Sequence, residues 1–217
     1  MRNTWILACG IAGLIGCGSS SPANVDGNTV HDGNVDGAGS NANQVNGQIN
    51  GQSFNAKDAI WKQFSSTNGF SFDGPAAFVE MTDYTGSCAL AAQGMAPTTS
   101  LILDLGVGVN DASAMTTAPT SPGTFTVFDD SNPLPASMNV GQVYLGSGCS
   151  KDIAYSGTSG TITITSVHQD GSYAGTFDIM VSCSSFSSCA GPDAHLTGTF
   201  SSASCVSLDV NTIPACS

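Results

Sequence analysis

Apolar and polar residues alternate with a period of two along much of this chain, which is the pattern of half-buried β-strands. The pattern is clearest from Leu101 to Val109, where five aliphatic side chains share one predicted face. In the stretch 173–183 the apolar residues again fall on odd-numbered positions, and Asp178 points the other way. Near the C-terminus, Leu196 and Phe200 are predicted to face inward, with Thr197 and Thr199 outward.

Shorter runs of the same kind extend the prediction to most of the chain after Val45. Further strands are expected at 60–64, 70–72, 78–82, 125–128, 140–145 and 161–167. A helical turn or two is expected at 87–93, but no stretch of twelve or more residues has the 3.6-residue period of a helix. Asn46-Gly47 and Asn50-Gly51 are hairpin-type turn sequences. The sequence therefore predicts an all-β fold, an antiparallel β-sandwich or β-barrel of about eight to ten short strands.

A weak internal similarity joins two of these segments. Both 173–179 and 196–201 contain the tripeptide Gly-Thr-Phe. We interpret them as two adjacent strands rather than as a repeat.

The N-terminus has the features of an export signal. Arg2 provides the positive charge, and the apolar run Trp5–Ile15 is too short to span a bilayer as a helix. The following Leu14-Ile15-Gly16-Cys17 resembles the lipobox of bacterial lipoproteins. That resemblance implies cleavage before Cys17 and fatty acyl chains such as palmitate on this residue. It also implies the outer membrane, on its periplasmic or cell-surface face, because Gly18 rather than Asp follows the cysteine.

Three regions follow from this interpretation. Residues 1–16 are the lipoprotein signal peptide, and residues 17–44 are the lipidated cysteine and a flexible tether rich in Gly, Asn, Ser and Asp. Residues 45–217 are a single all-β domain. Within the tether, 32–37 matches the first half of a calcium loop, but Asn43 stands where a bidentate acid is needed. We therefore predict no metal site and no cofactor.

Charge limits the partners. After the signal the chain has three lysines against sixteen acidic residues, a net charge of −13. Such a surface repels nucleic acid and anionic lipid headgroups, so we expect no nucleic-acid binding. Membrane attachment is expected through the covalent lipid on Cys17, whereas a protein, glycan or small-ligand partner is left open.

Cysteine usage agrees with export. Cys9 leaves with the signal and Cys17 carries lipid, so six cysteines stay in the domain, an even number typical of a disulfide set. Their spacing does not match a zinc knuckle. We predict the pairs Cys183–Cys189, Cys205–Cys216 and Cys88–Cys149.

Candidate chemistry is sparse. The sequence contains no G-x-S-x-G elbow, and His168 precedes a turn sequence. His195 follows Asp193 and could form a triad with this acid and a serine, but no further residue supports that arrangement. Trp61 is interpreted as a core residue rather than a sugar-stacking platform. We predict no catalytic residues.

Three functions fit these observations. A lipid-anchored, non-catalytic binding or structural module is expected. A β-barrel carrier of small apolar ligands is the alternative, and a secreted hydrolase is the third. A carrier should contain an apolar cavity, a module should have a filled core, and a hydrolase should hold His168 or His195 against an acid inside a cleft.

Overall fold

The computed structural model describes residues 42–64, 72–129, 132–147, 152–169, 171–183, 191–208 and 215–216. Most of these residues lie in strands, and one short helix is present among them, so the predicted all-β fold is confirmed. In chain order the first half contains β1 (Gln44–Asn46), β2 (Gln48–Ile49), β3 (Gln52–Ser53), β4 (Asp58–Phe64), β5 (Ala76–Thr82), α1 (Ser87–Ala91), β6 (Met95–Ala96) and β7 (Leu101–Asn110). The second half contains β8 (Thr116–Thr117), β9 (Gly123–Val127), β10 (Asn139–Ser147), β11 (Asp152–Val167), β12 (Tyr173–Cys183), β13 (Ala194–Ser201), β14 (Ala203–Ser204) and β15 (Ala215–Cys216).

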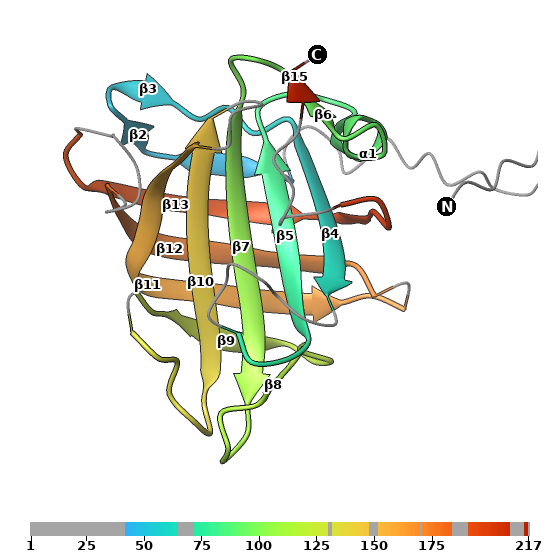
Figure 1. Ribbon diagram of the computed structural model, residues 1–217, viewed down its shortest axis with the longest axis vertical. Coiled ribbons are helices and arrows are strands. Elements are labelled where there is room, and N and C mark those ends of the chain that lie inside the picture. The colour runs from blue at the N-terminus through green and yellow to red at the C-terminus, as the bar shows by residue number, and fades with distance from the viewer. Residues whose placement is uncertain are drawn as a thin grey trace, which may run out of the picture. The chain divides into compact units, whose positions relative to one another are not determined.

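One curled sheet contains most of the strands. Its order is β1-β13-β12-β11-β9-β10-β7-β5-β4-β14, with β8 added beside β7. In Figure 1, β4, β5, β7 and β10 form a front layer, and β11, β12 and β13 run across behind them. The domain is therefore a half-barrel formed by one sheet that folds over itself. This geometry lies between the sandwich and the closed barrel that the sequence left open.

The long strand β11 joins the two layers. Its first residues pair with β10 of the front layer, and residues 161–164 pair with β9 of the back layer. Between these parts the register with β12 shifts at Gly157 and Ser159, and Gly160 has a φ of 117°. A bulge with a positive-φ glycine bends a strand, so this region forms the corner at which the sheet turns.

The space between the layers is filled by apolar side chains. In β12, Tyr173, Phe177, Ile179 and Val181 are buried, and Asp178 is exposed on the opposite face, as predicted. The predicted inward positions of β13, Leu196 and Phe200, are also buried. Together with residues of β5, β7, β9 and β11 these side chains form the main core.

The two Gly-Thr-Phe segments are adjacent antiparallel strands, which confirms their interpretation. Gly175 pairs with Phe200, and Phe177 pairs with Gly198. A β-carbon on Gly175 would lie 2.7 Å from Phe200 Cζ, so the aromatic ring occupies the space above the glycine. In each tripeptide, the phenylalanine provides a ring and the glycine leaves space for the ring of the other strand.

The turn predictions were confirmed at one of the two Asn-Gly sites. Asn50 and Gly51 have φ values of 51° and 75° and close the β2–β3 hairpin, as a type I′ turn requires. By contrast, Asn46 belongs to β1, and Gly47 forms a bend into β2, so no hairpin is formed there. Residues Ala42 and Asn43 already hydrogen bond with β13 through Thr199 and Ser201.

Strand β7 departs from the predicted pattern because both of its faces are buried. The face that contains Ile102, Asp104 and Gly106 is covered by a second apolar cluster that includes Phe72 and Phe78. A β-carbon on Gly106 would lie 2.6 Å from Phe78 Cε1, so this face is as tightly packed as the inner one.

Two of the predicted disulfides are wrong. Cys88 bonds with Cys205, at a sequence separation of 117, and replaces both Cys88–Cys149 and Cys205–Cys216. The cause is the chain's return to the front layer after β13, where β14 pairs in parallel with β4 and the Cys205 amide donates to the Trp61 carbonyl at 2.9 Å. Cys183 and Cys216 are also disulfide-bonded, while Cys149 and Cys189 lie outside the described residues, so the pair Cys183–Cys189 stays a prediction.

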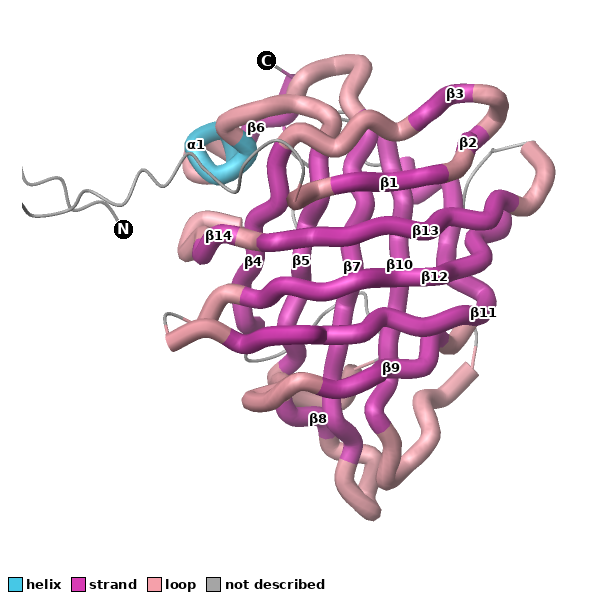
Figure 2. Tube along the Cα trace, turned by 180° about the vertical axis from the view of Figure 1, so that it is seen from behind, coloured by secondary structure: helices cyan, strands magenta, loops and turns pink. Residues whose placement is uncertain are grey.

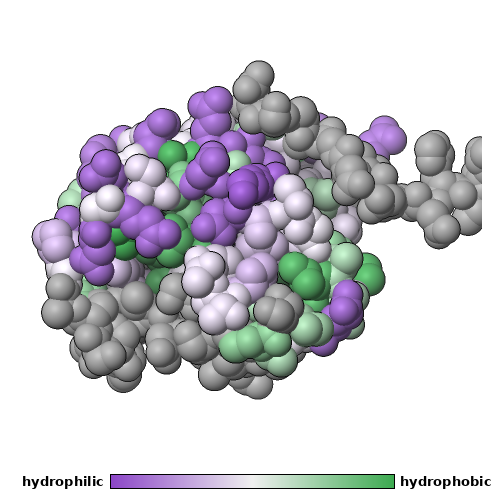
Figure 3. All heavy atoms as spheres, turned by 90° about the horizontal axis from the view of Figure 1, so that it is seen from above, coloured by the Kyte–Doolittle hydropathy of each residue, from purple (hydrophilic) through white to green (hydrophobic). Residues whose placement is uncertain are grey.

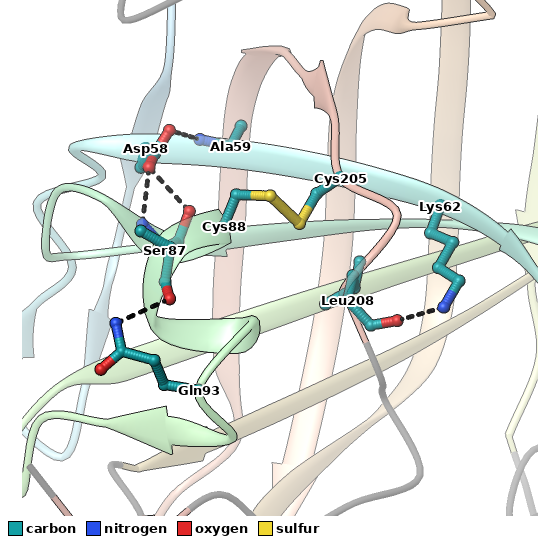
Figure 4. Close-up of a disulfide and its surroundings, with 9 residues drawn as sticks. Asp58, Ala59, Lys62, Ser87, Cys88, Gln93, Cys205 and Leu208 are labelled. Carbon is teal, nitrogen blue, oxygen red and sulfur yellow. Dashed lines mark hydrogen bonds between the residues drawn. A yellow bond between two sulfur atoms is a disulfide. The ribbon is translucent and has the colours of Figure 1, made fainter. Parts of the chain in front are cut away.

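The surroundings of this disulfide explain how its two ends meet (Figure 4). Asp58 on β4 accepts hydrogen bonds from the amide and the hydroxyl of Ser87, at 3.0 and 2.7 Å, and this holds the start of α1 against the strand. On the same strand, Lys62 Nζ donates to the Leu208 carbonyl at 2.8 Å and holds the segment after β14. Cys88 and Cys205 are thus brought together by contacts with β4.

Candidate functional site

The residues proposed from the sequence as candidates for chemistry do not gather at one place. His195 Nε2 lies 2.7 Å from Asp178 Oδ1, across the β12–β13 pair. The two side chains are 57% and 69% exposed, so the pair lies on the open outer surface of the back layer. The predicted neighbour Asp193 is replaced by Asp178, because outward residues of adjacent strands meet across the sheet. A histidine and an acid without a surrounding cleft lack the dry, preorganised setting of a hydrolytic triad.

His168 is a turn residue, as expected. Its backbone closes the β11–β12 turn, with its amide donating to the Ser172 carbonyl and its carbonyl accepting from Gly171. The exposed imidazole lies 3.3 Å from the Ser166 hydroxyl.

Trp61 lies in the core, as predicted. It is 9% exposed and packs edge-to-face on Tyr173, with ring centroids 4.9 Å apart. The Tyr173 hydroxyl donates to the Pro119 carbonyl, and burial raises the pKa of this phenol. The ring of Trp61 is therefore not available as a stacking platform for a sugar.

The structure brings together two acidic residues that sequence reasoning did not single out. Glu80 on β5 and Asp104 on β7 are direct cross-strand partners, and both are more than nine-tenths buried. Tyr144 of β10 pairs with Asp104 on the other side, and Ile60 of β4 pairs with Glu80. Side chains at such positions have β-carbons about 4.5 to 5.5 Å apart, so the two carboxyl groups lie on the same covered face of the front layer.

Tyr84 completes this buried acidic group. Its pKa lies well above the usual value, because burial disfavours the phenolate and the charges of Glu80 and Asp104 add to the effect. The phenol is therefore held in its protonated form. A signal for this group exists in the sequence, since Glu80 is the one glutamate of the chain and stands in an apolar run.

The acidic group does not form a metal centre with further ligands among the residues described. No three His, Cys, Asp or Glu side chains there are placed to hold an ion. Two further carboxylates act on Tyr84, those of Asp58 and Asp83, and both accept hydrogen bonds from backbone amides, Asp58 from Ser87 and Asp83 from Leu101. These two aspartates therefore have a structural role as hydrogen-bond acceptors.

The interior of the half-barrel is packed with side chains. A β-carbon on Gly157 would lie 2.8 Å from Val143 Cβ and 2.9 Å from Val127 Cγ1, and Phe125 and Ile162 beside them are fully buried. A hollow of about 240 Å³ lies instead against β1, and its lining is mostly polar, from Asn43 to Asn46 and from Phe54 to Ala56. Figure 3 shows the upper end of the domain, where hydrophilic residues stand beside smaller apolar patches on the described surface.

Within the described ranges, no helix has the length and apolar character needed to cross a bilayer. Comparison of the chain with protein-family models, with curated proteins and with solved structures found no match.

Proposed function

We propose that this chain is an exported lipoprotein, anchored through acyl chains on Cys17, whose β-domain is a non-catalytic binding or structural module. The observation that carries the proposal is the Cys88–Cys205 disulfide, which cross-links the domain between positions 117 residues apart. Disulfides of this structural kind form and persist in oxidising, extracytoplasmic compartments. The N-terminal sequence predicts export independently of this disulfide.

The anchoring step rests on Leu14-Ile15-Gly16-Cys17 and its distance from Met1. One acyl chain holds a protein at a membrane only marginally, whereas two or more give stable attachment. With a net charge of −13 after the signal, the protein is repelled by anionic headgroups, so the acyl chains must supply the attachment. We place the protein at the outer membrane, because Gly18 follows the cysteine.

Two features support a non-catalytic binding or structural module: the filled core and the exposed position of the His195–Asp178 pair. The filled core disfavours a carrier, which needs an apolar cavity for its ligand. The exposed His195–Asp178 pair disfavours a hydrolase, which needs the pair inside a cleft. Binding through the outer surface is then the role that fits the described geometry.

Metabolic labelling with a fatty-acid analogue tests the anchor. The wild-type chain should become labelled and sediment with membranes, and Cys17→Ser should lose both properties. Cys9→Ser is the matched control, because Cys9 leaves with the signal and its loss should not affect labelling. Equal labelling of wild type and Cys17→Ser would overturn the proposal.

The location is tested by membrane fractionation in a Gram-negative host. The wild type should migrate with the outer membrane, and Gly18→Asp should shift the protein to the inner membrane while labelling stays unchanged. A wild-type protein found in the inner membrane would contradict the proposed location.

A further inference from the structure

The outer surface of the back layer presents threonines in two rows that run across the strands. They come from four adjacent strands, β9, β11, β12 and β13, which run side by side in Figure 2. We call the following residues the threonine face: Thr124, Thr126, Thr161, Thr163, Thr176, Thr197 and Thr199.

The strand register fixes this array. The first row is Thr124, Thr163, Thr176 and Thr199, each the cross-strand partner of the next. The second row is Thr126, Thr161, Asp178 and Thr197, joined in the same way. Neighbouring strands lie about 4.8 Å apart, and residues two positions apart on a strand lie about 6.7 Å apart. The hydroxyl and methyl groups therefore repeat on a two-dimensional grid.

Most of these hydroxyl groups are available to a partner. Thr124, Thr126 and Thr176 are exposed, and Thr161, Thr163 and Thr197 are half-buried. Among the described residues, Thr126 and Thr176 have no side-chain hydrogen bond, whereas the Thr124 and Thr163 hydroxyls lie 3.2 Å from each other. Thr199 is also half-buried, and its hydroxyl donates to the Ala42 carbonyl.

Charge indicates what kind of partner fits. The chain after the signal has a net charge of −13, yet Asp178 is the one ionisable side chain in the two rows, and it is engaged with His195. A face with a single acidic side chain on so acidic a protein is complementary to an uncharged surface. The rows also contain no aromatic side chain, so they lack the stacking platform that sugar rings use.

The hydrogen-bonding needs of the threonines also limit which kind of partner can bind this face. A protein partner that covered the face without water would leave several hydroxyls without bonds, and each such burial is unfavourable. A surface of ordered water instead offers partners to the hydroxyl groups that are still open, such as those of Thr126 and Thr176, and accommodates the methyl groups between them. The oxygen atoms in the surface layers of hexagonal ice repeat at spacings close to both spacings of the grid. The twist between strands limits this match to a few strands, which is the extent of the threonine face.

We propose that the threonine face binds ice. This inference deepens the proposed binding role by naming its ligand, and it does not depend on the lipid at Cys17.

The test is partition of the protein into slowly growing ice. The full-length chain with Cys17→Ser is used, so that no acyl chain affects its solubility. The protein concentration in the ice should at least equal that in the remaining liquid, whereas serum albumin is excluded from the ice. The double variant Thr126→Lys/Thr176→Lys should be excluded to the level of albumin, because two long charged side chains break the grid.

The control is Thr117→Lys, which places the same side chain on an exposed threonine of β8 outside the grid. This variant should enter the ice as strongly as the protein whose threonine face is unaltered. Both single variants are also measured, and near-ultraviolet circular dichroism checks that each protein keeps its fold. Exclusion of the unaltered face from ice overturns the proposal, as does equal partition of the double variant. Binding to an insoluble neutral polysaccharide, with exclusion from ice, would overturn it in favour of a glycan surface.

Discussion

The ring of Phe177 on β12 occupies the place where a β-carbon of Gly198 on β13 would stand. The same relationship holds in reverse for Phe200 and Gly175. An aromatic ring over a cross-strand glycine compensates for the side chain that the glycine lacks and pins the register of the two strands. The pairing thus fixes how β12 and β13 meet at the centre of the back layer.

We predict that Gly198→Ala destabilises the domain. The new methyl group would overlap the Phe177 ring and the Gln44 carbonyl, and overpacking of this kind costs about 1 to 3 kcal/mol. Urea unfolding followed by fluorescence of Trp61 measures the change. Gly123→Ala is the matched control, because Gly123 also precedes a Thr-Phe pair, Thr124 and Phe125 of β9, but its β-carbon would lie 3.4 Å or more from its nearest neighbours. Similar losses in the two variants would contradict the prediction.

The disulfide provides a second prediction. Cys88→Ala/Cys205→Ala should lower the free energy of unfolding by about 4 to 5 kcal/mol, since the bond closes a loop of more than one hundred residues in the unfolded chain. Urea unfolding without reductant measures this difference. Mass spectrometry of a non-reduced Asp-N digest should recover a peptide that joins Cys88 to Cys205. Recovery of Cys88 joined to Cys149 would instead refute the pairing.

The third prediction concerns alkaline pH. Because the pKa of Tyr84 is raised in the folded protein, the unfolded chain releases this proton more readily. The contribution of Tyr84 to stability is therefore complete below about pH 10 and is lost as the pH rises above the ordinary tyrosine value. Unfolding free energies measured between about pH 9 and 11.5 should fall, and Tyr84→Phe should make the fall less steep. An equal slope in both proteins would show that Tyr84 titrates normally.

The strands could be predicted from the sequence because local periodicity determines which side of a strand faces the core. In β12 the alternation of Tyr173, Phe177 and Ile179 with polar residues was enough to assign its two faces. The same argument failed at β7, where Ile102, Asp104 and Gly106 lie under a second apolar cluster. A residue's own strand does not reveal whether another segment covers its outer side.

The disulfide and the acidic group required information that spans the whole chain. Cys88 and Cys205 meet because β14 pairs with β4, a contact between distant parts of the sequence. Glu80 and Asp104 meet because β5 and β7 are neighbours in one particular register. With fifteen aspartates in the chain, no pair of acids could be preferred before that register was known.

The strand order also determines when the domain can fold during synthesis. Gln44 in β1 emerges from the ribosome early, but its partner Thr199 in β13 is made near the end of the chain. Cys88 must likewise wait for Cys205, and Cys149 is made before that partner arrives. The domain therefore stays incomplete until almost all of it has been synthesised. When the exported chain enters an oxidising compartment N-terminus first, Cys149 reaches Cys88 before Cys205 does, and a bond between Cys88 and Cys149 would have to be exchanged by a thiol–disulfide isomerase.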